Sequence, residues 1–268
     1  MSSSERTIVA TDFVDRAAID AWAKDASKGL ISRAIEGPLD PDTQLILMNA
    51  VYFKGFWKKP FSVRSTFKGT FLNHGTEPHL TDIMYMRAEF PVKSLPAIDA
   101  QAILLPYQGD DAAMMVVLPG TPTGVDALLQ ALSVTDLLRS LNTFENISVD
   151  LFLPKLEMEG SYMLKQGLRS LGVRRIFEKG HAELSGIGPL LALSDVAHRA
   201  KVKVDERGTE AVALTTLPFV TYSSYPTFSA VHPFLFFIVH RSTGTVLFAG
   251  KSGPHIAGCV TQNCSAAM

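Results

Sequence analysis

The amino-acid sequence predicts an α+β fold with a large, mostly antiparallel sheet. Three observations favour it. Short apolar segments with strand patterns occur along most of the chain, and Pro and Gly residues separate them. A third is that helical spacing is confined to a few segments. The chain has 268 residues, of which 47% are hydrophobic. This is enough for one large domain or two ordinary ones with a substantial core.

The first expected elements are a helix and a buried strand. Residues 12–35 have an amphipathic helical pattern, with Asp12 as a plausible N-cap and Gly37-Pro38 as the stop. Residues 44–53 are almost continuously apolar, which predicts a strand covered on both faces. Asn49 lies in the middle of this strand. A buried Asn must find hydrogen-bond partners, and a locally satisfied Asn is the simplest alternative.

The middle of the chain predicts further strands and two helices. The region from Phe61 to residue 80 is charged and rich in turn residues, so no strand is expected there. The expected strands are 81–90, 102–106, 113–118 and 147–153, and the expected helices are 125–141 and 162–171. Gly172 is expected to end the last helix at its C′ position.

The stretch from His198 to Ser223 has an unusual composition. It begins as a strand in which Ala200, Val202 and Val204 alternate with polar residues. The strand pattern breaks before residue 208, and small and β-branched residues with few charges follow. Long loops are normally polar and strand edges are normally protected. One explanation is that this segment becomes a strand at a later stage.

Composition excludes several classes of function. The net charge is −1, which gives no indication of nucleic acid or an anionic membrane as a partner. The longest apolar runs, such as 234–239, are far too short to span a bilayer. The two cysteines, Cys259 and Cys264, lie in the C-terminal tail and provide no disulfide framework for the core. Residues 1–6 do not have the features of a signal peptide, and the localisation is left open.

No motif for catalysis, a metal or a cofactor is present in the sequence. There is no HExxH, Walker A or GxGxxG pattern, and the seven histidines form no ligand-spaced cluster. Ser185 lacks the G-x-S-x-G context of a nucleophile elbow. We therefore expect no enzyme, no metal and no cofactor.

Three motifs resemble the serpin family of serine protease inhibitors in order and spacing. Residues 206–213 (ERGTEAVA) resemble the hinge of the serpin reactive loop, and residues 49–57 (NAVYFKGFW) resemble an upstream family motif. Residues 231–238 (VHPFLFFI) and 244–251 (GTVLFAGK) resemble the downstream motif. The resemblance covers nearly the whole chain, but roughly the first third of the family's domain has no counterpart in it.

The resemblance implies a fold and its divisions. The expected fold is serpin-like, with a large, mostly antiparallel central sheet, a smaller β-barrel-like sheet and packed helices. Residues 1–268 would form a single partial serpin-like domain. Residues 206–230 would be the reactive-centre loop and residues 252–268 a C-terminal tail.

The resemblance also implies roles for individual residues. Asn49 and His198 would be neighbours in a polar cluster under the centre of the sheet. Lys155 would pair with the hinge residue Glu206, although two unrelated surface charges are the alternative. Trp57 would mark the point where strand insertion begins, which is compatible with simple core packing. The hinge residues would be Glu206, Gly208, Thr209, Glu210, Ala211 and Ala213.

The mechanism implied for the family is inhibition by a suicide substrate. A serine protease would cleave the exposed loop, which would then insert as a strand and trap the covalently attached enzyme. The family's hinge-to-cleavage spacing places the reactive bond at Tyr222-Ser223. Tyr222 predicts a chymotrypsin-like target, as would the nearby alternatives Phe219 and Tyr225. The partner would be this protease alone, with the inhibitor a monomer and extracellular by family resemblance.

Some loop residues depart from the family pattern. Arg207 replaces the acidic residue usual before the hinge glycine, and Val212 and Leu214 are bulkier than the usual alanines. Pro218 has no N–H to donate to an inserted strand. These departures, and the missing third, leave open a non-inhibitory or inactive scaffold whose loop is only a protease substrate. A hydrolase is disfavoured because no nucleophile motif is present.

Overall fold

The computed structural model describes residues 16–27, 29, 31–33, 35, 42–53, 55–207 and 225–253. The chain divides into two compact units with interleaved ranges. The first unit contains residues 1–53, 157–203 and 260–268, and the second contains residues 54–156 and 204–259.

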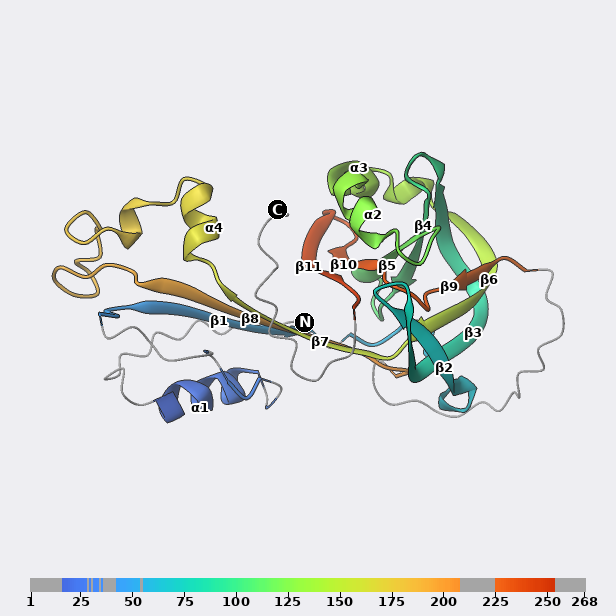
Figure 1. Ribbon diagram of the computed structural model, residues 1–268, viewed down its shortest axis with the longest axis horizontal. Coiled ribbons are helices and arrows are strands. Elements are labelled where there is room, and N and C mark those ends of the chain that lie inside the picture. The colour runs from blue at the N-terminus through green and yellow to red at the C-terminus, as the bar shows by residue number, and fades with distance from the viewer. Residues whose placement is uncertain are drawn as a thin grey trace. The chain divides into compact units, whose positions relative to one another are not determined.

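The second unit is built on an eight-stranded sheet. Seven strands follow the order β11-β10-β5-β4-β3-β6-β9, and β2 pairs with β3 beside this path (Figure 1). The strands are β2 Thr66–Asn73, β3 Glu77–Leu95, β4 Ala100–Pro106, β5 Ala112–Pro119, β6 Glu145–Pro154, β9 Thr227–Ser229, β10 Leu235–His240 and β11 Thr245–Lys251. All the pairs in this sheet are antiparallel except β6 with β9, which is parallel. The predicted large, mostly antiparallel sheet is therefore confirmed.

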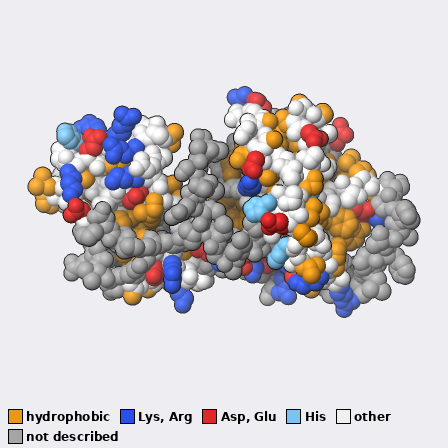
Figure 2. Space-filling model, viewed as in Figure 1, with side chains coloured by type: hydrophobic (Ala, Val, Ile, Leu, Met, Phe, Trp, Pro, Cys, Tyr) orange, Lys and Arg blue, Asp and Glu red, His pale blue; other side chains and the backbone are white. Residues whose placement is uncertain are grey.

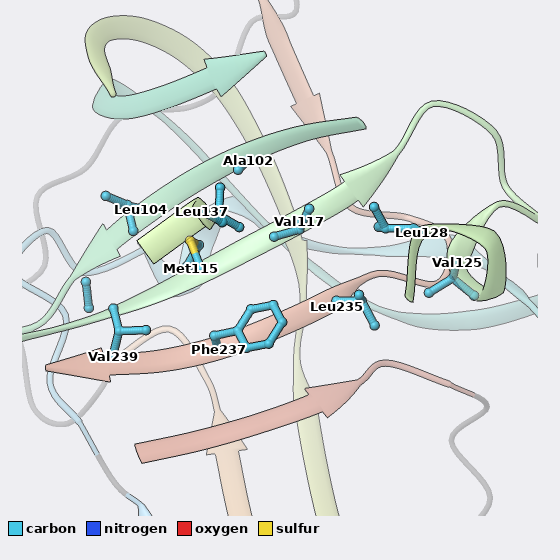
Figure 3. Packing of buried hydrophobic residues seen from close by; sticks show 11 residues of the cluster. Ala102, Leu104, Met115, Val117, Val125, Leu128, Leu137, Leu235, Phe237 and Val239 are labelled. Atoms are coloured by element: carbon cyan, nitrogen blue, oxygen red, sulfur yellow. The ribbon is translucent and has the colours of Figure 1, made fainter. Parts of the chain in front are cut away.

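One cluster of core residues in this unit lies on one face of the sheet. Alternate residues of β4, β5 and β10 point to the same side, as Met115, Val117 and Phe237 show in Figure 3. Two short helices, α2 Val125–Ala131 and α3 Val134–Arg139, cover this face through buried apolar side chains.

The predicted single helix over 125–141 is wrong, because it is two helices. The break falls at Leu132 and Ser133. The Ser133 side chain accepts a hydrogen bond of 3.3 Å from the backbone N–H of Asp136, so it caps the second helix. Serine favours such caps over a helix interior, since its hydroxyl competes for backbone groups. Residues Leu141–Thr143 then form a 3-10 turn.

A hairpin occupies the region where no strand was expected. β2 pairs with the first part of β3 across a turn in which His74 and Gly75 have φ angles of 51° and 81°. Both values are left-handed, which suits glycine in a tight turn. The expectation of an irregular region was wrong because these strands carry charged and exposed residues, so their pattern lacks a continuous apolar face.

The first unit contains a three-stranded sheet in the order β1-β8-β7. Its strands are β1 Ile46–Phe53, β7 Leu156–Met163 and β8 Asp195–Val204. β1 and β8 are parallel, with eight residue pairs from Ile46↔Asp195 to Phe53↔Val202. Helix α1, Arg16–Ala26, covers one face through Ile19 and Ala23, which pack with Ala197 of β8 (Figure 1).

The helix predicted over 12–35 is shorter in the structure. Residues 12–15, including the proposed cap Asp12, lie outside the described part. The helix ends at Ala26, so the predicted stop at Gly37-Pro38 is wrong. Gly29 ends it instead: its φ is +83°, and its N–H donates to the Lys24 carbonyl at 2.6 Å. A left-handed glycine of this kind commonly ends helices.

Two further predictions for this unit need correction. β1 is not covered on both faces, since 54% of Leu47 is exposed and Asn49 is exposed as well. The helix predicted over 162–171 is strand β7 up to Met163 and helix α4 only over Lys165–Ser170. The Asp195 carboxylate accepts from the Lys165 N–H at 3.1 Å, so a residue distant in sequence marks the start of α4. Gly172 does take the expected left-handed conformation, with a φ of +94°.

The surface carries charges of both signs. Figure 2 shows Lys and Arg side chains over the part of the first unit that contains α4, with Asp and Glu side chains among them. Within the described residues, no helix has the length and apolar character needed to cross a membrane.

Candidate functional site

The described residues include both ends of the predicted reactive loop. The predicted hinge residues Gly208, Thr209, Glu210, Ala211 and Ala213 lie outside the described residues, as does the predicted reactive bond Tyr222-Ser223. The chain is described up to Arg207 and again from Tyr225. The candidate site therefore consists of the groups that hold these ends and of the sheet in the first unit.

Glu206 is anchored in the second unit by a buried carboxylate. Its side chain is 6% exposed, and its Oε1 lies 2.7 Å from Lys155 Nζ. The Thr66 hydroxyl donates to the same oxygen, also at 2.7 Å. The predicted Lys155–Glu206 contact is thus present, and the alternative of two unrelated surface charges is wrong because the carboxylate is buried. Nothing in the sequence pointed to Thr66.

The surroundings of Glu206 favour its charged form. Burial opposes ionisation, but the hydrogen bonds from Lys155 and Thr66 outweigh it, so the pKa of Glu206 lies below its usual value. The Glu206 carbonyl also accepts from the Phe61 N–H at 3.0 Å. Side chain and backbone together fix this residue two positions after the end of β8.

Trp57 holds the neighbouring residue. Its indole N–H donates to the Asp205 carbonyl at 2.9 Å. The indole is 3% exposed and stacks on Tyr107, with 4.6 Å between ring centroids and 9° between planes. Phe61 packs against its edge at 6.4 Å. Burial raises the pKa of Tyr107, so its hydroxyl stays neutral. Trp57 is therefore both a core residue and a donor to the chain that leads into the loop.

Asn49 and His198 meet in the first unit. They are directly opposite in the β1–β8 register, and Asn49 Nδ2 lies 3.2 Å from His198 Nδ1. The expected neighbours are in contact, but the prediction of a buried Asn49 is wrong because its side chain is exposed. The Tyr162 ring stacks near His198 at 6.3 Å. Burial lowers the pKa of His198, so the neutral ring can accept the Asn49 hydrogen bond.

β1 and β8 are directly paired in the sheet of the first unit. Direct neighbours over eight residue pairs leave no strand between them. The described residues contain no group of three or more His, Cys, Asp or Glu side chains that could hold a metal ion.

Comparison with solved structures shows that the fold is serpin-like. A family model described as "Serpin (serine protease inhibitor)" matches residues 3–252. The chain belongs to the serpin family. The family description names inhibition of serine proteases and no catalytic activity.

Similar proteins agree with this assignment. Iripin-2 of Ixodes ricinus is 39% identical over 246 residues, which cover 90% of this chain and 60% of the relative. Leukocyte elastase inhibitor of Xenopus tropicalis is 35% identical over 88% of this chain and 65% of its own length. Among solved structures, uncleaved ovalbumin matches with a TM-score of 0.77 and 28% identity, over 90% of this chain and 64% of that chain. The chain thus spans somewhat less than two thirds of the length of these proteins.

Proposed function

We propose that the chain inhibits a serine protease with chymotrypsin-like specificity. The protease cleaves the reactive loop, residues 206–230, at Tyr222-Ser223. The loop then inserts as a strand between β1 and β8, and the acyl-enzyme is trapped. Residues 1–268 act as one partial serpin domain in this proposal. The names of relatives support a protease as the partner, since one is called a leukocyte elastase inhibitor and another an intracellular coagulation inhibitor.

The parallel β1–β8 pair is the observation that carries the proposal. The loop follows β8 in the sequence, so a segment that turns back from β8 would run antiparallel to both β8 and β1. An inserted strand would replace one ladder by two. With about 1 kcal/mol of net stabilisation per hydrogen bond, an added ladder of this length contributes on the order of 5–10 kcal/mol. This energy would be released only after the loop is cut.

One face of the proposed inserted strand would carry only small side chains at its start. In an extended strand, Thr209, Ala211 and Ala213 share a face, and all three are small. Glu210 belongs to the opposite face and must stay near solvent. Val212 and Leu214 are bulky for this position and would slow insertion, which favours release of a cleaved substrate over trapping.

The target class follows from the residues near the reactive bond. A chymotrypsin-like primary pocket accepts a large aromatic side chain such as Tyr222. A trypsin-like pocket requires Lys or Arg, and neither occurs between Thr209 and Ala230. Tyr222 therefore supports a chymotrypsin-like target over a trypsin-like one.

Incubation with chymotrypsin, followed by denaturing electrophoresis and mass spectrometry, tests the proposal. A band at the summed mass that survives boiling in detergent is the expected result, with a C-terminal fragment that begins at Ser223. Tyr222→Ala should lower the rate of cleavage, while Phe219→Ala serves as the matched control and should not move the cut. Ala211→Arg should still be cleaved but should not trap, because a charged side chain would enter the sheet.

Two results would count against the proposal. Cleavage without a covalent complex would show a scaffold whose loop is only a substrate. A cut outside residues 219–225 would overturn the assignment of the reactive bond.

A further inference from the structure

The chain after the loop enters the sheet as a short strand. β9 has three residues, and its only partner among the described strands is β6, in parallel from Asp150↔Thr227 to Phe152↔Ser229. Parallel pairing is slightly less stable per residue than antiparallel pairing, and a three-residue ladder contributes little. Backbone hydrogen bonds at Pro226, Ala230 and Val231 add to this ladder, and so do side-chain contacts.

A buried carboxylate lies at the start of this short ladder. The side chain of Asp150 is 7% exposed. Arg87 binds it through both oxygens, with Nε to Oδ1 at 2.7 Å and Nη2 to Oδ2 at 3.1 Å. The Tyr85 hydroxyl donates to Oδ1 at 2.8 Å. A two-pronged bond of this kind fixes the plane of the guanidinium as well as its position.

The fixed guanidinium lies against the first described residue after the loop. The central carbon of the Arg87 guanidinium is 4.9 Å from the centroid of the Tyr225 ring, which is a cation–π contact. The backbone N–H of Asp150 also donates to the Pro226 carbonyl at 2.9 Å. Asp150 therefore holds this end of the chain twice, through its backbone and through Arg87.

We propose that Asp150, Arg87 and Tyr225 form a clamp that positions the C-terminal side of the reactive loop for the attacking protease. The inference rests on the proposed function for the identity of the reactive bond. Tyr225 is three residues beyond Tyr222, so an extended chain places it within about 10 Å of that residue. A protease bound at this bond covers the clamp.

The exposure of the clamp residues matches this role. Tyr225 is 47% exposed and the Arg87 side chain is 39% exposed, while the carboxylate that holds them is buried. The clamp thus has a rigid base and an accessible aromatic and cationic surface. A merely structural cluster would stabilise β9 without any effect on the reaction with a protease, and this difference can be measured.

Four variants separate positioning from fold stability and from charge. Arg87→Lys keeps the charge but removes the planar, two-pronged contact. Tyr225→Ala removes the ring, and Tyr225→Phe retains it. Lys68→Met is the matched control, since Lys68 forms an exposed ion pair with Asp82 at 3.0 Å in the same sheet. The readouts are kcat/KM for cleavage by chymotrypsin, the yield of covalent complex, and hydrogen exchange of residues 227–229.

The clamp predicts a distinct pattern in these data. Arg87→Lys and Tyr225→Ala should each lower kcat/KM about tenfold, and the double variant should fall no further than either single one, because the two residues act together. Tyr225→Phe and Lys68→Met should stay within about twofold of the wild type. Arg87→Lys should also speed hydrogen exchange in β9.

Failure of the clamp and failure of trapping give different results. Wild-type rates in Arg87→Lys and Tyr225→Ala would overturn the clamp even if a covalent complex forms. An equal loss in Lys68→Met would also overturn it, because the effect would then not be specific to the clamp residues. Cleavage without a complex would overturn trapping alone. If chymotrypsin does not cut the loop, wild-type hydrogen exchange in Arg87→Lys would still overturn the clamp.

Discussion

Lys155→Met should loosen the anchor at the start of the reactive loop by a measurable amount. Methionine keeps most of the apolar stem of lysine and removes the ammonium group that lies 2.7 Å from Glu206 Oε1. A hydrogen bond to a charged group contributes about 1.5–3 kcal/mol to stability. Because 35% of the Lys155 side chain is exposed, water weakens the interaction, and we expect a loss of about 1.5–2 kcal/mol. Thr66 remains as a donor and limits the damage.

Urea unfolding followed by the fluorescence of Trp57 measures this loss. The chain has two tryptophans, Trp22 and Trp57, and the second donates to Asp205 beside the anchor. A Trp22→Phe background makes the signal specific to the second unit. With a urea dependence of about 2 kcal/mol per molar, the midpoint should fall by nearly 1 M. Lys68→Met, at an exposed pair of the same sheet, should cost about 0.5 kcal/mol or less.

A double-mutant cycle decides whether the Lys155–Glu206 contact causes the loss. Glu206→Gln, alone and combined with Lys155→Met, should give a coupling energy of about 1 kcal/mol. A coupling below about 0.3 kcal/mol would refute the anchor.

Acidification offers a second check. The folded-state pKa of Glu206 is lowered. Its ionised carboxylate therefore contributes fully to the free energy of unfolding above about pH 4.3, and this contribution is lost as the pH falls through the lower folded-state pKa. Glu206→Gln should remove this dependence.

Three further predictions concern the first-unit sheet and the second-unit fold. Burial lowers the pKa of His198, so the first unit should lose stability as the pH falls from about 6.5 toward that lower pKa, and His198→Gln should abolish the effect in unfolding curves measured across this range. Gly75→Ala should cost about 2–3 kcal/mol in urea unfolding, because its Cβ would collide with the Pro122 carbonyl oxygen at a φ of +81°. Gly244→Ala, with a φ of +66° but open space, should cost about 1 kcal/mol. Phe237→Ala should lower the free energy of unfolding by about 3–5 kcal/mol, since the ring is buried in the core; a loss below 1 kcal/mol would contradict that packing.

Strands with continuous apolar runs were the most predictable elements. The segment 113–118 is buried throughout in β5, as a strand covered on both faces should be. The same pattern misled for 44–53, because Leu47 and Asn49 are exposed in β1. Apolar composition predicts that a segment forms a strand but does not specify what covers each face.

Helix boundaries were less predictable, and a distant group marks one of them. The start of α4 coincides with a hydrogen bond that the Lys165 N–H donates to the Asp195 carboxylate, across thirty residues of sequence. The end of α1 at Ala26, by contrast, has a local signal in the left-handed Gly29, although the expected helical pattern over 12–35 runs past this glycine. Local rules therefore apply where the cap comes from the same segment.

The anchor residues show what a sequence resemblance can and cannot supply. The pairs Lys155–Glu206 and Asn49–His198 were expected from the family motifs, and both contacts are present. Thr66 and the clamp residues were not found, because their contacts cross between strands and depend on register. One signal was available: Tyr85 and Arg87 alternate on one strand and so share a face, a common setting for cross-strand pairs.

The two ends of the reactive loop are held by similar chemistry of unequal strength. Glu206 and Asp150 are both buried carboxylates that accept from one cation and one hydroxyl. Lys155 contacts a single oxygen of Glu206, whereas Arg87 contacts both oxygens of Asp150 and is fixed in its plane. A point contact separates more readily than a planar, two-pronged one.

This difference fits the sequence of events in the proposed mechanism of inhibition. The hinge must leave its anchor when the loop inserts, while the chain after the cut must stay in place. We therefore expect cleavage at Tyr222-Ser223 to break the Lys155–Glu206 contact and to leave the clamp intact. Two measurements before and after cleavage test this. Hydrogen exchange should show unchanged protection of residues 227–229. The fluorescence of Trp57 should change, because its environment beside the anchor changes. A loss of protection at residues 227–229 together with the change in Trp57 fluorescence would show that the two anchors do not differ in strength.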